Sequence, residues 1–281
     1  MKKLSKAIKI IVCIALSVVV LLGVWQLSVH IRSSKYDLIT LDTSVLPDPI
    51  TEPGFDGFVQ LSDVNVHYRI YGEKGKQPLL LIHGNGGSCN SLSEAATYLA
   101  NDYTVYVPES RCHGQSSDPG EITYKLMAKD IYEFCKKLKI KKPYIMGHSD
   151  GGINALTVAC EYPDLPGAII SCGANTVPSE FKPYFTIGVK LNNIFHPDKL
   201  NDLMLTLPDF TKEDFAKIKC PSYIVAAEFD IMWLSDNVYI ADCIENSRFS
   251  IIKWANHGSY MSHDGKQAYA LAKGFFDTLE K

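Results

Sequence analysis

Short apolar runs alternate with amphipathic stretches along most of the chain after residue 57. A continuous apolar run that ends in glycine or a polar residue is typical of a parallel strand covered on both faces. The stretches between the runs have the spacing of helices that cover a sheet. The segments that contain these runs are 76–84, 103–109, 143–146, 167–175, 221–230 and 248–256. The pattern predicts a three-layer α/β fold with a mostly parallel sheet of about eight strands.

Three segments depart from this alternation. Residues 57–61 and 64–72 predict an antiparallel hairpin at the start of the globular domain, 57–281. Residues 177–214 lose the strand–helix pattern and are rich in aromatic residues, which predicts a short helical cap inserted in the domain. The preceding segment, 33–56, is rich in Pro, Asp, Thr and Ser. We expect a linker there, either a stalk or an extended segment lying on the domain.

The N-terminal segment, residues 1–32, has the pattern of a membrane anchor. Lysines at positions 2, 3, 6 and 9 precede an uncharged, mostly apolar run from Ile10 to Leu27, which is long enough to span a bilayer. The lysine excess favours a single-pass protein with its N-terminus inside and its domain outside the cytoplasm. Secretion after cleavage of a signal peptide is the alternative, although no small-residue cleavage site follows the run.

Composition and cysteine spacing argue against nucleic acid as a partner and against a metal or organic cofactor. A net charge of −3 and a pI of about 6.2, without a broad basic face, argue against a nucleic-acid-binding protein. The eight cysteines show no Cys-x-x-Cys pair and no spacing of metal ligands, so we expect free thiols and no metal or organic cofactor. The oligomeric state is left open.

The stretch Gly147-His148-Ser149-Asp150-Gly151 carries the strongest chemical signal. A Gly-x-Ser-x-Gly sequence between a strand and a helix predicts a nucleophile elbow, a sharp turn that presents a serine hydroxyl above the sheet. Glycine is needed on both sides because a strained turn packed against backbone leaves no room for a Cβ atom. The sequence predicts Ser149 as a nucleophile, with an ordinary turn serine as the alternative.

Two later strands also end in candidate catalytic groups. One ends at Asp230, and the last strand is followed by His257. Serine, acid and histidine in this order form a triad in which imidazole takes the serine proton and the carboxylate orients the imidazole. Glu228 is expected to be buried in or beside its strand, and His263 is a rival base farther into the loop.

A tetrahedral oxyanion needs hydrogen-bond donors beside the nucleophile. The residues His83-Gly-Asn-Gly-Gly87 follow a strand, where a backbone N–H can point at the site. We predict that the backbone N–H groups of Asn85 and Asp150 form the oxyanion hole. The triad already has a base, so His83 is expected to be structural.

From about Phe58 onward the chain resembles the α/β-hydrolase superfamily. The resemblance is carried by the glycine-rich loop at 83–87, the Glu-x-Arg-x-His-Gly-x-Ser pattern at 109–116, the elbow, Asp230 and His257. It implies a three-layer α/β-hydrolase fold and a serine hydrolase activity.

Within that superfamily the chain resembles the biphenyl hydrolase-like (valacyclovir hydrolase) group. The matching residues are 147–156, Tyr162-Pro163 and 173–175, whereas Glu109 and Cys112 stand where relatives commonly have Asp and Gly. That group hydrolyses esters of amino acids, and its carboxylate after the nucleophile is thought to receive the substrate ammonium.

Asp150 matches that carboxylate. The resemblance implies amine recognition, while a simpler interpretation is that Asp150 caps the following helix. The substrate-binding residues that we predict are Asp150, Gly86, Trp233, Phe181 and Phe185. The aromatic residues of the cap could equally form the core that attaches it to the sheet.

These observations predict a serine esterase that cleaves small carboxylic esters through an acyl-enzyme. Carbon–carbon bond hydrolysis or acyl transfer on the same triad is one alternative. A non-catalytic binding protein on a hydrolase fold is another, from a different functional class.

Overall fold

A computed structural model describes residues 14, 17, 18, 20, 37–261 and 264–279. The chain divides into two compact units, Met1–Leu38 and Ile39–Lys281. The predicted anchor at 10–27 lies almost entirely outside the described residues and stays a prediction. Within the described part of the chain, no helix has both the length and the apolar character needed to cross a membrane.

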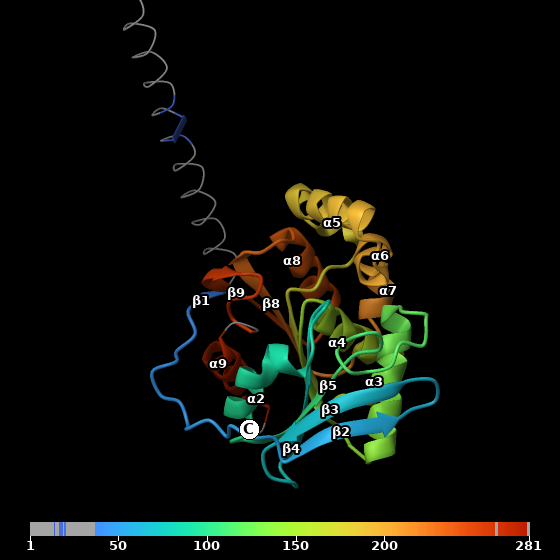
Figure 1. The fold of residues 1–281 in the computed structure, drawn as a ribbon. Helices are drawn as coiled ribbons and strands as arrows, with labels where there is room; N and C mark the ends of the chain where they lie inside the picture. The colour runs from blue at the N-terminus through green and yellow to red at the C-terminus, as the bar shows by residue number, and fades with distance from the viewer. Residues whose placement is uncertain (1–13, 15–16, 19, 21–36, 262–263, 280–281) are drawn as a thin grey trace, which may run out of the picture. The chain divides into compact units, whose positions relative to one another are not determined.

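A mostly parallel sheet forms the centre of the fold (Figure 1). Its strand order is β1-β9-β8-β7-β6-β4-β5-β3-β2. The strands β2 and β3 pair antiparallel, as do β3 and β5, while the pairs from β5 through β4, β6, β7 and β8 to β9 are parallel. The predicted α/β class and the antiparallel first hairpin are confirmed. The bounds are β1 Asp37–Ile39, β2 Phe55–Gln60, β3 Asn65–Tyr71, β4 Gln77–Ile82, β5 Tyr103–Pro108, β6 Tyr144–His148, β7 Ala168–Cys172, β8 Ser222–Phe229 and β9 Ser247–Asn256.

Helices cover both faces of the sheet (Figure 1). The helices α3 (Tyr124–Leu138), α4 (Asp150–Glu161) and α8 (Leu234–Cys243) contribute to one buried cluster, and α2 (Ser93–Leu99) and α9 (Gly265–Phe276) contribute to the other. A short 3-10 helix, η1 (Cys89–Leu92), leads into α2. The two clusters give the three layers that the alternation predicted.

Strand β4 shows why the buried runs are continuously apolar. Leu79 and Leu81 pack in the cluster with α2 and α9, while Leu80 and Ile82 pack in the cluster with α3, α4 and α8. Successive side chains point to opposite faces of a strand, so a strand covered on both faces needs apolar residues at every position.

The segments outside the alternation have structure of their own. The predicted cap contains η2 (Pro178–Glu180), α5 (Pro183–Phe195), α6 (Lys199–Thr206) and α7 (Lys212–Phe215). Within the predicted linker, Leu41, Leu46 and Ile50 pack against the cluster of α2 and α9, and Asp56 already belongs to β2. From Ile39 onward this segment therefore lies on the domain rather than forming a stalk.

Candidate active site

Ser149 occupies a strained turn between β6 and α4. Its φ and ψ are 57° and −120°, a region that non-glycine residues rarely adopt, and its N–H donates to the Cys172 carbonyl at 2.8 Å. A Cβ atom on Gly147 would collide with the Gly151 carbonyl, and one on Gly151 would collide with the Ile82 carbonyl. Both glycines are therefore required by backbone contact, as the elbow motif predicts.

Asp230 and His257 form a hydrogen-bonded pair at the ends of β8 and β9. Asp230 is fully buried and accepts from His257 Nδ1 at 2.7 Å and from the N–H groups of Ala227 and Ile231 at 3.1 and 2.8 Å. Burial acts to raise the pKa of Asp230, but the bond and charge of His257 and the two amides together lower it below its ordinary value. The carboxylate is therefore ionised at neutral pH and holds the imidazole by Nδ1.

Gly173, directly after β7, lies against the Asp230–His257 pair. A Cβ atom there would lie 2.9 Å from His257 Cε1 and 3.6 Å from Asp230 Oδ2. The residue before it, Cys172, accepts the N–H of Ser149. Within the described chain the Ser149 hydroxyl makes no hydrogen bond, so its link to His257 belongs to the proposal below.

The predicted oxyanion donors lie on either side of the serine. The loop after β4 passes close to it, since a Cβ atom on Gly84 would lie 3.0 Å from Ser149 Cβ. Asp150 is the first residue of α4, and the first N–H groups of a helix have no acceptor within it. Among the described residues neither the Asn85 N–H nor the Asp150 N–H has an acceptor. Both are available for a ligand oxygen.

The side chain of Asp150 binds other side chains. Its carboxylate accepts from Asn85 Nδ2 at 3.0 Å and is hydrogen-bonded by Tyr124 of α3. Asn85 Nδ2 also donates to the Leu200 carbonyl of α6 at 3.1 Å. The N-cap of α4 is Ser149, so the simple capping interpretation of Asp150 is replaced by a role in fixing the Asn85 loop. Burial raises the pKa of Asp150, against the effect of its hydrogen bonds with Asn85 and Tyr124.

Comparison with known proteins places this geometry in a family. The chain matches the family described as alpha/beta hydrolase fold over residues 77–237, more than half of its length. The chain belongs to the α/β-hydrolase family. Within it, the narrower resemblance to the biphenyl hydrolase-like group stays a prediction.

Curated relatives of this α/β-hydrolase match over part of their length. An uncharacterized hydrolase of Bacillus subtilis (strain 168) is 30% identical over 113 residues, which are 39% of this chain and 41% of that protein. An sn-1-specific diacylglycerol lipase of Xenopus tropicalis is 33% identical over 128 residues, 43% of this chain and 40% of that protein. The matches thus span about two-fifths of the length of these relatives.

A solved structure shares the fold at low identity. The enol-lactonase from Burkholderia xenovorans LB400 is 18% identical, with a TM-score of 0.65 over 80% of this chain and 100% of that one. At this identity the likeness bears on the α/β-hydrolase fold alone.

The predicted aromatic substrate-binding residues of this hydrolase, Phe181, Phe185 and Trp233, lie around the loop that follows Asp230. Phe181 is buried, forms a bridge with Met232 and packs its ring 4.8 Å from that of Phe185. The Trp233 indole is half exposed, with the Lys182 ammonium 5.8 Å from its ring centre. Gly86 has a positive φ and open space where a Cβ atom would stand, so the loop is uncrowded on that side. Two other cap aromatics, Tyr184 and Phe195, are exposed.

The sequence offered three further titratable residues near the predicted triad and oxyanion loop: His83, Glu228 and His263. His83 Nε2 accepts the Ser110 N–H and its Nδ1–H donates to the Gly84 carbonyl, so both ring nitrogens are used structurally. Burial and the nearby His113 lower the pKa of His83 to about 4. Glu228 is buried and accepts the Trp254 N–H. His263 lies outside the described residues.

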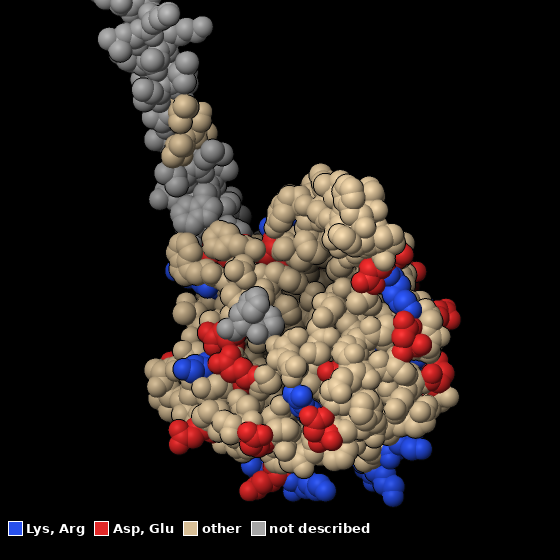
Figure 2. All heavy atoms as spheres, in the orientation of Figure 1, with Lys and Arg blue, Asp and Glu red and all other residues tan. Residues whose placement is uncertain are grey.

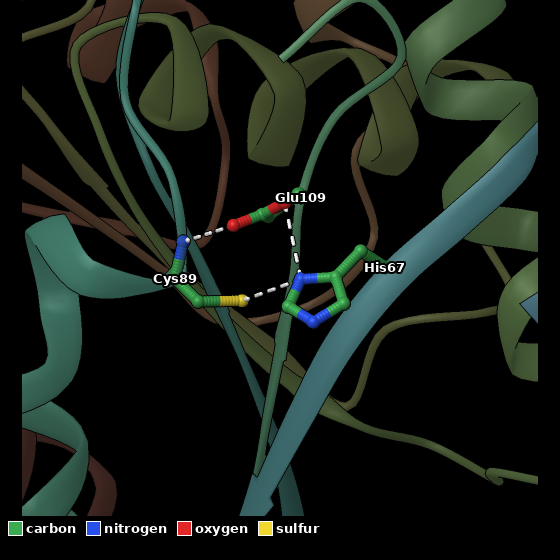
Figure 3. Close-up of side chains that lie close together, drawn as sticks. All are labelled: His67, Cys89 and Glu109. Carbon is green, nitrogen blue, oxygen red and sulfur yellow. Dashed lines mark hydrogen bonds and ion pairs between the residues drawn. The ribbon is translucent and has the colours of Figure 1, made fainter. Parts of the chain in front are cut away.

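His67, Cys89 and Glu109 form a buried cluster whose ligand atoms lie close enough to surround a metal ion (Figure 3). Each group, however, already has a partner. The two imidazole nitrogens of His67 face carboxylates, Glu109 at 3.1 Å and Asp56 at 2.6 Å, and the Cys89 thiol donates to the Val107 carbonyl. Burial raises the pKa of the Cys89 thiol, which disfavours the thiolate that binds metals. The cluster is better explained as a hydrogen-bonded network that connects β3, the end of β5 and η1.

All seven cysteines in the described part of the chain are free thiols, as expected.

Sequence reasoning missed two side chains of the site. One is Tyr124, which is hydrogen-bonded to Asp150, and the other is Lys182, whose ammonium donates to the Asp230 carbonyl at 2.6 Å. Each reaches the site from an element that is distant in sequence, so no local motif points to it.

Proposed function

We propose that this chain is a serine hydrolase that cleaves small carboxylic esters through an acyl-enzyme. The observation that carries the proposal is the Asp230–His257 pair, held at the same end of the sheet as the strained Ser149. Because Asp230 holds Nδ1, the other ring nitrogen of His257 is the one that takes the Ser149 proton during attack on the ester carbonyl. The ionised carboxylate then stabilises the imidazolium.

The remaining steps use the same residues. The N–H groups of Asn85 and Asp150 stabilise the tetrahedral oxyanion, and His257 returns its proton to the leaving alcohol. Water activated by His257 then attacks the acyl-serine and releases the acid. The names of two similar proteins, a diacylglycerol lipase and an enol-lactonase, both denote cleavage of a carboxylic ester and so support this reaction class.

A fluorophosphonate probe tests the nucleophile directly. We expect the probe to label the wild-type chain and to leave Ser149→Ala unlabelled, because the reagent reacts with an activated serine hydroxyl. Ester turnover should fall by about 10³-fold or more in the same variant. A wild-type chain that takes no label would instead support a binding protein on a hydrolase fold.

The substrate class is tested with a panel of nitrophenyl esters, amino-acid esters and ring-cleavage diketones. Ester turnover supports the proposal, and diketone cleavage without it would favour carbon–carbon bond hydrolysis. Added alcohols that capture the acyl group faster than water would indicate acyl transfer.

The role of Asp150 is resolved within that panel by Asp150→Asn. The carboxylate already accepts bonds from Asn85 and Tyr124, which favours support of the oxyanion loop over amine binding. We therefore expect Asp150→Asn to lower kcat for esters with and without an α-amino group alike, by about tenfold. A loss confined to α-amino esters and expressed in KM would establish amine recognition.

From the sequence alone, we also propose that residues 10–27 anchor the chain with its domain outside the cytoplasm. Retention in membranes after alkaline carbonate extraction, with the domain open to external protease, is the expected result. A shorter chain released into the medium would establish cleavage and secretion.

A further inference from the structure

The cap helix α5 exposes an apolar face to solvent. Its 13 residues include none that is buried. The side chains on that face are exposed by 52–74%; they are Tyr184, Ile187, Leu191, Ile194 and Phe195. At 100° per residue, their positions fall within an arc of about 100°.

The opposite side of α5 faces the rest of the cap. Phe185, Val189 and Asn193, spaced by four positions, are half-buried, and Asn193 Nδ2 donates to Asp202 of α6 at 2.7 Å. The exposed arc is therefore a distinct face of the helix, the one left over once α5 has packed on its own domain. A contiguous apolar surface of this kind marks an interaction site.

One further aromatic side chain continues this surface beyond the helix. Trp233 follows the loop to which α5 is joined, since Lys182 N–H donates to the Ile231 carbonyl. Trp233 is exposed by 47%, and the Lys182 ammonium lies 5.8 Å from its ring centre. The visible surface of α5 in Figure 2 is uncharged almost throughout.

We propose that the exposed face of α5, with Trp233 beside it, docks on the surface of a lipid bilayer. A helix of 13 residues is about 20 Å long, too short to span the hydrocarbon layer, so it lies in the interface. Within residues 181–197 the charged side chains are lysines, Lys182 and Lys190, and no acidic residue occurs there. Tryptophan, tyrosine and lysine at the border of an apolar surface are typical of the lipid headgroup region.

The sequence before the domain favours a bilayer over other occupants. The uncharged run at 10–27 predicts an anchor, and residues 28–36 separate it from β1. A segment of that length reaches at most about 30 Å, which keeps the domain near the lipid surface at high effective concentration. An interface between two copies of the chain, by contrast, is usually poorer in lysine than the rest of a protein surface.

Photo-crosslinking tests the contact on the full-length chain reconstituted in bilayers. The bilayer contains phosphatidylcholine with a minority of phosphatidylglycerol, and a trace of phosphatidylcholine carrying a diazirine on its acyl chain. Labelled peptides are located by mass spectrometry. We expect the α5 peptide to be labelled about tenfold more than the β2 peptide, whose Phe58 is also half exposed but lies at the far edge of the sheet.

Variants sharpen the result. Ile187→Asn/Leu191→Asn/Ile194→Asn should reduce α5 labelling to the β2 level, while the matched control Phe58→Asn should leave it unchanged. Circular dichroism checks that each variant is folded, and Leu191→Asn alone replaces the triple variant if the latter unfolds. Equal labelling of α5 and β2, or protein–protein cross-links through α5 in place of lipid label, would overturn the proposal. The readout is independent of ester turnover, so it stands or falls separately from the proposed reaction.

Discussion

Helices α4 and α5 are similar in length and both are largely apolar, yet they occupy opposite environments. Every residue of α4 from Asp150 to Cys160 is buried, whereas α5 buries none. Apolar content alone therefore does not determine where a helix lies. What separates the two is the surface that each is offered by the fold.

The surface offered to α4 is the face of the sheet itself. It follows β6 directly and packs against β4, β6, β7 and α3, so its apolar residues are covered on all sides. Helix α5 belongs to the insertion between β7 and β8, above the carboxyl ends of the strands, and packs mainly on α6 (Figure 1). Its outer face has no protein layer to cover it among the described residues.

The same substitution in the two helices should have opposite effects, and the larger is in α4. Gly151→Ala places a methyl group against the Ile82 carbonyl, a backbone atom that cannot move aside cheaply. We expect a loss of about 4 kcal/mol in the free energy of unfolding, measured by urea denaturation. A variant as stable as the wild type would show that the elbow is not packed as described.

The next largest effect on the free energy of unfolding is expected at Asp236, where the sheet joins the cap. Asp236 at the start of α8 accepts from the N–H and hydroxyl of Thr176, at 2.8 and 2.6 Å. Thr176 in turn accepts the Phe210 N–H from the other end of the cap. Burial raises the pKa of Asp236 to about 6, against the opposing effect of Thr176.

The sign of the pH dependence follows from that shift. Between pH 4 and 6 the folded chain binds more protons at Asp236 than the unfolded chain, so this group's contribution to stability falls as pH rises through the window. Asp236→Asn cannot ionise and should gain about 2 kcal/mol relative to the wild type on going from pH 4 to pH 7. Urea denaturation of both chains across this range measures the difference, and parallel curves would contradict it.

The smallest effect is expected in α5. A Cβ atom on Gly188 meets nothing within 4 Å, and the residue lies in the helix interior. Gly188→Ala should therefore stabilise the chain by about 0.5–1 kcal/mol, because alanine loses less backbone entropy on folding. Thermal unfolding should show a Tm higher by about 1–4 °C. A lower Tm would mean that α5 is packed against a neighbour on that side.

Local patterns carried much of the fold and of the candidate site. The buried runs predicted β4 to β9 because strands covered on both faces leave a continuous apolar signal. Thr123 has a residue type that favours helix N-caps, and its hydroxyl accepts the Leu126 N–H at the start of α3. The sequence predicted Ser149, Asp230 and His257 as one site, because the carboxyl ends of parallel strands lie at one edge of a sheet.

Other features had no local signal. The bond between Asp150 and Tyr124, and that between Asn85 and Leu200, join elements far apart in sequence. The sequence predicted that the aromatic residues of the cap line a pocket or form its core, yet Tyr184 and Phe195 of α5 are exposed. A pattern records that a residue is apolar, but whether another layer covers it depends on how the elements pack.

The sequence by itself determined the order of strands and helices, the elbow with its two glycines, and the three residues of the proposed triad. These depend on short-range backbone geometry and on the alternation of strand and helix, which a single chain displays directly. Only the tertiary structure decided that Gly173 lies against His257, that Asp150 secures the Asn85 loop, and that α5 turns its apolar face outward. Those outcomes depend on which surfaces meet in space, and the sheet has room to cover some apolar helices and not others.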